Sequence, residues 1–298
     1  MDNRAEVREF LISRRAKVTP DLAGLPSGPN RRVAGLRRAE VATLAGVSVE
    51  YYAKLERGAI AGASSSVLDA ISRALQLDDT ERAHLFDLAR VADGIPLSGR
   101  PRRRASRSSA LRPSLQWAVE SISDGVAFVR NSHQDVLATN ELGRAFYSPL
   151  VGDGGRTPNL ARFQFLDPTS HEFYPDWDLF AEMCVAIMRA EAGRDPHNKD
   201  LHDLVGELST RSDIFRTLWG AHNVRTHGAG VKRFTHPIVG EVTLAYEEFA
   251  ITADPGTILM IYTAEPGSPS AERLALLASW AASNREKTQT RSEASSHD

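Results

Sequence analysis

The sequence lacks the residues and segments that mark several protein classes. Its 298 residues include one cysteine, Cys184, which cannot form a disulfide within the chain, so we expect a structural thiol in a reducing compartment. No run reaches the roughly 18 apolar residues that a membrane helix needs. The charged N-terminus has no apolar stretch of the kind found in signal peptides. These absences predict a cytoplasmic chain with no membrane partner.

Motifs for catalysis and for metal binding are also missing. The chain contains no G-x-S-x-G nucleophile elbow, no P-loop and no Rossmann glycine pattern. Its histidines are scattered, and pairs such as His197 and His202 have no cysteine beside them. We therefore expect no enzyme, no metal site and no cofactor. An enzyme is the alternative, because a catalytic triad is assembled in space and not in sequence.

Charge is distributed unevenly along the chain. The formal net charge is −2, yet residues 1–112 hold 20 Lys and Arg against 13 Asp and Glu, while residues 113–298 hold 16 against 25. A basic front half followed by an acidic rear half indicates that one end of the chain meets phosphate groups and the other does not.

Periodicity and composition predict an α+β protein with two domains. Residues 1–92 carry five short helical patterns, typical of a compact all-α domain. Residues 93–113 are rich in Gly, Pro, Ser and Arg and predict a basic linker. Residues 114–283 mix helical patterns with strands rich in Val, Ile, Thr and Tyr, which predict a mixed α/β domain with an antiparallel sheet. The polar residues 284–298 predict a disordered tail.

The expected elements are as follows. In the front domain, helices are expected over 4–17, over 36–45, over 49–57, after Ser64–Ser66, and from Asp78 or Asp79. In the rear domain, a hairpin is expected from strands at 125–131 and 134–140, three further strands within 231–251 and 257–264, and helices over 175–192, 200–220 and from Ser268 or Ser270 to about Ala282.

Residues 36–58 (LRRAEVATLAGVSVEYYAKLERG) predict a helix-turn-helix. Gly46 supplies the turn between the two helices, and Ser48 is a good N-cap for the second. Small and apolar residues recur at helical spacing on both sides of this turn, so we expect them to face a common core. They are Val41, Ala42, Ala45, Val47, Tyr52 and Leu55. An ordinary helical hairpin is the alternative.

The outer side of the second helix is the predicted reader of DNA bases. The side chains of this helix that are not expected in the core face outward, and they can reach base edges when the helix lies in the major groove. Arginines at the start of the first helix and at the end of the second suit phosphate contacts. The residues predicted to bind DNA are Arg31, Arg32, Arg37, Arg38, Ser48, Val49, Glu50, Tyr51, Lys54 and Arg57.

Two further basic segments have two interpretations each. Arg31 and Arg32 lie in a loop rich in Gly and Pro before the first helix of the motif. The linker contributes Arg102, Arg103, Arg104 and Arg107. Such runs are either solvated surface or arms that reach the DNA backbone or minor groove.

In the rear domain, spacing alone predicts no more than a mixed α/β fold. Bulky apolar side chains gather between Phe163 and Met188, where they either fill a core or line a cavity. The candidate ligand-binding residues are Phe146, Phe163, Phe165, Trp177, Phe180, Met183, Trp219, His222 and Arg225. A ligand with an acidic head would need a cation, for which the candidates are His222, Arg225, Lys232 and Arg233.

Several motifs resemble known families. In the front domain, Ala-Gly-Val-Ser at the turn (residues 45–48), the capped second helix and the closing Glu-Arg-Gly (residues 56–58) resemble XRE/Cro-type helix-turn-helix proteins. The motifs R-R-V-x-G-L-R-R-x-E-V-A (Arg31–Ala42) and V-E-Y-Y-x-K-L-E (Val49–Glu56) are similar to the front half of MmyB-like regulators. In the rear domain, F-L-D-P, Y-P-D-W, L-V-G-E-L-S, K-R-F-x-H-P-x-V-G and Y-T-A-E-P-G-S-P-S resemble the MmyB-like ligand-binding domain. Together the resemblance covers about residues 5–282.

The resemblance implies a ligand-responsive transcription regulator. It implies a PAS-like rear domain, a fatty-acid-like apolar ligand, and binding to a double-stranded DNA operator as a homodimer, hence association with the nucleoid. The family is found chiefly in actinobacteria. The alternative is that the rear domain binds another protein or dimerises and takes no small molecule.

Overall fold

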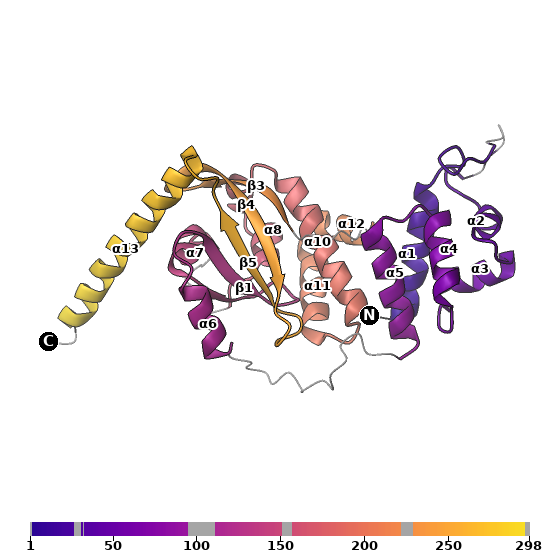
Figure 1. Cartoon of the computed structure of the whole chain (residues 1–298), viewed down its shortest axis with the longest axis horizontal. Helices are drawn as coiled ribbons and strands as arrows, with labels where there is room; N and C mark the ends of the chain where they lie inside the picture. The colour runs from indigo at the N-terminus through magenta and orange to yellow at the C-terminus, as the bar shows by residue number, and fades with distance from the viewer. Residues whose placement is uncertain are drawn as a thin grey trace. The chain divides into compact units, whose positions relative to one another are not determined.

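The computed structural model describes residues 2–26, 31, 33–94, 111–150, 157–221 and 229–295, with side chains as far as Arg285 (Figure 1). The chain divides into two compact units. The first comprises Met1–Pro101 and Glu182–Thr226, and the second comprises Arg102–Ala181 and His227–Asp298. The domain limits 1–92, 93–113, 114–283 and 284–298 stay predictions.

The first unit begins with the helices expected from the sequence. Among the described residues of the front segment these are α1 (Asn3–Lys17), α2 (Arg38–Ala45), α3 (Val49–Glu56), α4 (Ser65–Ala74) and α5 (Asp79–Ala92). They enclose a core of apolar side chains that are almost fully buried, which include Val7, Phe10, Leu11, Leu36, Val41, Tyr52, Leu55, Ile71, Leu85 and Leu88. The predicted all-α front domain is confirmed.

Polar side chains fix where these helices begin. The carboxylate of Asp2 accepts from the N–H of Arg4, and the hydroxyl of Ser64 accepts from the N–H of Val67. Asp78 accepts from the N–H of Glu81 at 2.8 Å, and the Glu81 side chain in turn accepts from the Asp78 N–H. Each contact satisfies an N–H group that has no partner inside its own helix.

The first unit also contains three helices from the rear half of the chain. They are α10 (Trp177–Arg194) from Glu182 onward, α11 (Lys199–Arg211) and α12 (Asp213–Gly220). The helical segment expected over 200–220 is present, and it is divided into two helices. Ser212 interrupts it in an extended conformation (φ −133°, ψ 113°), and its hydroxyl accepts from the N–H of Phe215 to start α12.

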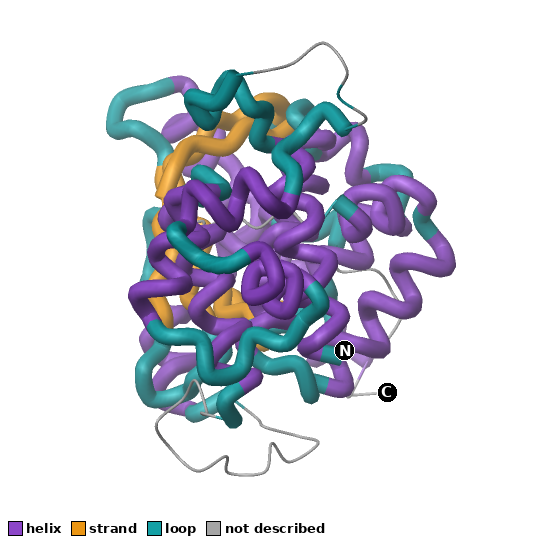
Figure 2. Tube along the Cα trace, turned by 90° about the vertical axis from the view of Figure 1, so that its right-hand side faces the viewer, coloured by secondary structure: helices purple, strands orange, loops and turns teal. Residues whose placement is uncertain are grey.

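The second unit is built on an antiparallel sheet of five strands within the described residues. Its strands are β1 (Val126–Arg130), β2 (Val136–Thr139), β3 (Ala229–His236), β4 (Gly240–Ala250) and β5 (Ile258–Thr263), in the order β2-β1-β5-β4-β3. The strands are drawn in orange in Figure 2. The predicted β1–β2 hairpin is confirmed, as is the antiparallel sheet of the α+β fold.

Helices join and cover the sheet. Within the second unit they are α6 (Pro113–Glu120), α7 (Glu141–Phe146), α8 (Leu160–Leu166), α9 (Ser170–Phe173) and α13 (Pro269–Ser295). The sequence had not predicted α6, α7, α8 or α9, which are too short to show a clear apolar period. Asn140 positions α7, since its side chain accepts from the N–H of Gly143 and donates to the carbonyl of Gly125.

The last helix is longer than expected. The sequence predicted an end near Ala282, whereas α13 continues to Ser295. Beyond Pro269 the segment has neither Gly nor Pro, and Ala, Glu, Lys, Arg and Gln in it are good helix formers. No helix among the described residues is long and apolar enough to cross a membrane.

Candidate DNA-binding face and ligand-binding domain

The turn between α2 and α3 is held by local geometry. Gly46 adopts a left-handed conformation (φ 64°), which other residues reach only with strain, and its N–H bonds to the carbonyls of Ala42 and Thr43. The hydroxyl of Ser48 then accepts from the N–H of Tyr51 at 3.0 Å and starts α3. The helix-turn-helix predicted over residues 36–58 is therefore present.

The two sides of α3 differ sharply in exposure. Tyr52 and Leu55 are buried in the core of the unit. Val49 is 41% exposed, and Glu50 and Lys54 are exposed as well. These residues form a free outer side suited to the major groove. Tyr51 differs from the other predicted readers, because it is half-buried and packs against the core.

The start of α2 presents arginines beside this outer side. Arg37 is exposed, and its backbone N–H donates to the carboxylate of Glu40 at 2.6 Å. The side chain of Arg38 is 53% exposed and donates from Nε to Glu56 at 2.9 Å. Arg57 is exposed at the end of α3. All three predicted phosphate contacts lie at the surface of the unit.

Arg31 occupies an ion pair in this structure. Its guanidinium donates to both carboxylate oxygens of Glu40, at 2.6 and 2.8 Å, and to the carbonyl of Gly35 at 2.9 Å. The hydrogen bond from Arg31 lowers the pKa of Glu40 to about 2. A DNA phosphate that binds Arg31 would therefore have to displace the carboxylate of Glu40. Arg32 lies outside the described residues, as do Arg102, Arg103, Arg104 and Arg107 of the linker.

An aromatic cluster fills the second unit on one side of the sheet. Phe146 lies 5.0 Å from Phe234 and 5.6 Å from Phe173 between ring centroids, and Phe163 lies 5.8 Å from Phe173. Phe180 stacks against Tyr174. Edge contacts of this kind stabilise a rigid apolar interior. Three of the predicted ligand-binding residues, Phe146, Phe163 and Phe180, meet in this cluster.

The remaining candidates are distributed differently. Trp177 packs on Phe165 and donates from its indole nitrogen to the hydroxyl of Ser170 at 3.0 Å. Met183 and Trp219 belong to the first unit and not to the unit that holds the aromatic cluster. His222 and Arg225 lie outside the described residues.

The ammonium group of Lys232 lies among aromatic rings of the second unit. Its ammonium lies 4.3 Å from the ring centre of Tyr246, 5.3 Å from that of Phe180 and 5.4 Å from that of Tyr262. The ammonium also donates to the Tyr262 hydroxyl at 3.5 Å, and Tyr147 donates to the same hydroxyl at 3.3 Å. We call Lys232 with Phe180, Tyr246 and Tyr262 the aromatic box. Among the described residues, no carboxylate pairs with Lys232.

Comparison with known protein families agrees with this geometry. Residues 111–277 match the model of the MmyB-like transcription regulator ligand binding domain, and residues 29–85 match that of a helix-turn-helix domain. The chain belongs to the MmyB-like transcription regulators. No curated protein matches it at a significant level. The MmyB-like regulator therefore combines a DNA-binding front domain with a ligand-binding rear domain.

Sequence reasoning missed a buried polar cluster in the first unit of this MmyB-like regulator. Arg189 on α10 donates to Glu6 on α1 at 2.6 Å, and its guanidinium lies 4.1 Å from the ring centre of Trp219. His84 on α5 lies 4.0 Å from the same Glu6 carboxylate. Each of these polar residues stands in an otherwise amphipathic helix, where the sequence pattern gives no sign of a partner far along the chain.

Within the described ranges, no group of three or more His, Cys, Asp or Glu is arranged to hold a metal ion. Cys184 is half-buried on α10.

Proposed function

We propose that this MmyB-like regulator binds a specific, two-fold-related DNA operator as a homodimer, and that an apolar acid bound in its rear domain changes operator occupancy. The observation that carries the DNA-binding part is the exposed outer side of α3 around Val49, Glu50 and Lys54. In a helix-turn-helix this side enters the major groove, while the first helix crosses the backbone. Arg37 and Arg38 at the start of α2 then lie at phosphates.

The homodimer is supported by an apolar strip on α13. Leu276 and Trp280, four residues apart on one side of the helix, are exposed, whereas Leu274 and Leu277 are buried. A two-fold-related operator requires a dimer with matching symmetry. Sedimentation of the full chain at the concentration that binds DNA is expected to give a dimer, and a monomer on and off DNA would contradict this part of the proposal.

The aromatic box supports an acidic ligand. A half-buried ammonium is costly unless an anion or hydrogen-bond acceptors compensate it. Lys232 has aromatic faces and a phenol around it, and a carboxylate placed there would also accept from the hydroxyls of Tyr147 and Tyr262. The surrounding rings suit an apolar chain behind such a head group, as in a fatty acid.

Helices of the first unit could transmit the effect of ligand binding to the DNA-binding helices. Residues 182–221 lie within the ligand-binding family match, yet they belong to the same compact unit as α1–α5. Arg189 on α10 binds Glu6 on α1, and Arg194 lies 3.7 Å from Asp87 on α5. A shift of α10 on ligand binding would therefore move contacts to the DNA-binding helices. Coupling of about 1–3 kcal/mol changes occupancy by about 5- to 150-fold.

Selection from a randomised duplex pool tests the DNA-binding part. The full chain is expected to return paired half-sites separated by about one helical turn or a multiple of it. Lys54→Ala should weaken binding to the selected duplex by about tenfold or more, because a base contact contributes about 1–3 kcal/mol. Arg73→Ala, at an exposed position in the last turn of α4, is the control. Unchanged affinity of the Lys54 variant would refute this assignment.

A pair of matched probes tests the ligand part. Hexadecanoic acid is expected to bind the purified regulator more tightly than hexadecanol, measured by the quenching of tryptophan fluorescence. Lys232→Met keeps the apolar stem but removes the charge, so it should weaken binding of the acid by about tenfold or more and leave the alcohol unchanged. Arg233→Met, whose wild-type side chain is exposed and paired with Asp176, is the control. Binding of neither probe would favour the protein-interaction alternative.

A further inference from the structure

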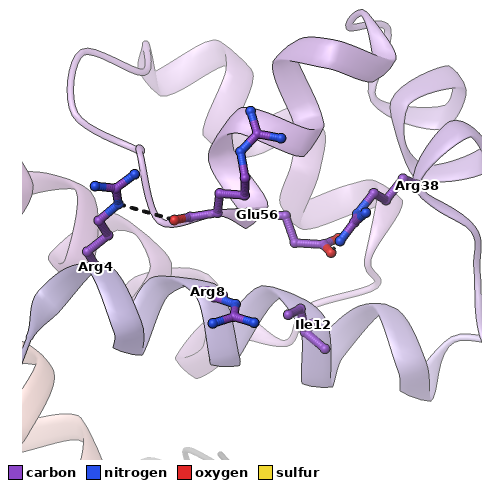
Figure 3. Close-up of a pocket in the computed structure, with 6 residues that line it drawn as sticks. Arg4, Arg8, Ile12, Arg38 and Glu56 are labelled. Carbon is purple, nitrogen blue, oxygen red and sulfur yellow. Dashed lines mark hydrogen bonds and ion pairs between the residues drawn. The ribbon is translucent and has the colours of Figure 1, made fainter.

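A groove of about 420 Å³ lies between α1 and the helix-turn-helix (Figure 3). The residues that line it are Arg4, Arg8, Ile12, Arg38, Glu56 and Arg57. We call this the arginine groove. In Figure 3, Arg4, Arg8 and Ile12 follow one another along α1, and Arg38 and Glu56 lie across from them. Four arginines and a single carboxylate make it a cationic site.

The close approach of α1 to the end of α3 depends on Gly58. This residue has φ +89°, and a Cβ at this position would lie 2.2 Å from the carbonyl oxygen of Arg4. Because glycine has no side chain, the backbone of α1 can lie directly against the turn that follows α3. Arg4 then reaches across to donate from Nε to the carbonyl of Arg57 at 3.4 Å. The first turn of α1 is thus fixed beside the helix-turn-helix.

The carboxylate of Glu56 does not neutralise the positive charge of the arginine groove. Glu56 is fully buried and is shared by two arginines, with Arg15 at 2.7 Å and Arg38 at 2.9 Å. Burial by itself would raise its pKa, but the hydrogen bonds from Arg15 and Arg38 hold that pKa below the ordinary value. Arg4 and Arg8 are both exposed, and among the described residues no carboxylate pairs with Arg8. The open side of the groove therefore presents uncompensated positive charge.

The position of the arginine groove indicates which anion it meets. Arg38 is the first residue of α2, and Arg57 directly follows α3. In a docked helix-turn-helix the start of the first helix lies on the DNA backbone next to the groove that the second helix occupies. Arg4 and Arg8 are one helical turn apart on α1 and line the same opening as Arg38. They extend a line of cations that begins at the start of α2.

We propose that the arginine groove grips the phosphodiester backbone of duplex DNA beside the segment read by α3, with Arg4 and Arg8 as contacts that widen the footprint. This inference rests on the proposed DNA binding and adds residues of α1 to it. The contact is independent of sequence, because phosphates are the same at every base pair. It therefore strengthens binding to the operator and to unrelated DNA alike.

The salt dependence of binding tests the proposal. The double variant Arg4→Ala, Arg8→Ala and the wild-type chain are titrated with the selected duplex and with a random-sequence duplex of the same length, at several salt concentrations. Each lost phosphate contact reduces the slope of log affinity against log salt by about 0.9. We expect the slope to fall by about two for both duplexes, with a similar loss of affinity for each. The control double variant, Arg73→Ala with Arg90→Ala, alters two exposed arginines outside the groove and should leave both slopes unchanged.

Ethylation interference gives an independent readout. With the wild-type chain, ethylated phosphates beside the half-site should reduce binding, and with the Arg4/Arg8 variant the same phosphates should have no effect. If the wild-type chain binds duplex DNA but the variant keeps its slope and interference pattern, the groove proposal is overturned and the DNA-binding proposal stands. If the variant instead loses binding of inorganic pyrophosphate while DNA binding is unchanged, the groove serves a free phosphate ligand and the proposal is again overturned. Failure of the wild-type chain to bind any duplex would instead refute the proposed function itself.

Discussion

The guanidinium of Arg189 and the carboxylate of Glu6 form an ion pair in which both side chains are removed from solvent. The Arg189 residue is 0% exposed and Glu6 is 6% exposed, and their atoms lie 2.6 Å apart. Arg189 also donates to the backbone carbonyl of Trp219 and lies over its ring. The pair joins α10 to α1, so that a helix within the ligand-binding match contacts the first helix of the front domain.

Removal of one member of this pair should destabilise the first unit strongly. Arg189→Met leaves the Glu6 carboxylate buried without its cation, and breaking a buried pair in this way costs about 3–5 kcal/mol. Urea unfolding at pH 7 measures the loss. The exposed Arg211 on α11, which pairs with Glu207 on the same helix, serves as the control, and Arg211→Met should cost about 1 kcal/mol or less. Adding Glu6→Met to Arg189→Met should recover part of the stability, and a double variant less stable than the single one would contradict this account.

The stability of the first unit should fall below neutral pH because of His84. Burial is the main reason that its pKa is lowered to about 4 in the folded state, whereas an unfolded histidine titrates near about 6.5. Between these values the unfolded chain binds a proton that the folded chain does not, so stability is greatest above about pH 6.5 and is lost as the pH falls toward 4. The contribution of His84 to this loss is about 2–3 kcal/mol between pH 7 and pH 4.5.

Urea unfolding across this pH range separates His84 from the other titrating groups. His84→Asn removes the titrating ring, so the free energy of unfolding should depend less steeply on pH in the variant than in the wild-type chain. Equal slopes for the two proteins would show that folding does not change the pKa of His84 and would contradict this prediction.

Two glycines allow the strain of a left-handed backbone to be separated from a steric collision. Gly58 and Gly62 both have positive φ, +89° and +75°. A Cβ at Gly62 meets open space, whereas one at Gly58 overlaps the backbone of Arg4. Gly62→Ala should therefore cost about 1 kcal/mol from strain alone, within the range of about 1–3 kcal/mol for such positions.

Gly58→Ala should cost clearly more than Gly62→Ala, because α1 must also move away from the turn that follows α3. Thermal unfolding of the two variants under identical conditions measures the difference. The proposed phosphate contacts of Arg4 add a second readout, since a displaced α1 should also reduce the salt slope of DNA binding. Equal stability of the two variants would mean that α1 does not rest on Gly58.

Sequence reasoning succeeded where the signal is local. Gly46 and Ser48 define the turn and the start of α3 through contacts within three or four residues. Their roles could therefore be predicted from the sequence. The β1–β2 hairpin was predictable for the same reason. Ser212 was missed because the residues on both sides of it favour helix, and only the extended backbone at this position divides the segment.

The candidate ligand-binding residues illustrate the limit of this reasoning. Phe146, Phe163 and Phe180 converge in one aromatic cluster, yet apolar bulk alone did not distinguish them from Met183 and Trp219, which belong to the other unit. Lys232 was one of several cations considered for an acidic head group. Its place inside the aromatic box depends on β3, β4 and β5 pairing in one register, because Tyr246 and Tyr262 come from the neighbouring strands.

The sequence by itself determined the helix-turn-helix and the outer side of α3, because capping residues and helical spacing act within a few residues of one another. The tertiary structure decided how charges far apart in the chain are combined. It buried Glu6 against Arg189, shared Glu56 between Arg15 and Arg38, and left Arg8 open on the arginine groove. Whether an ionisable side chain is paired or free depends on which segments meet in space, and no local pattern encodes that.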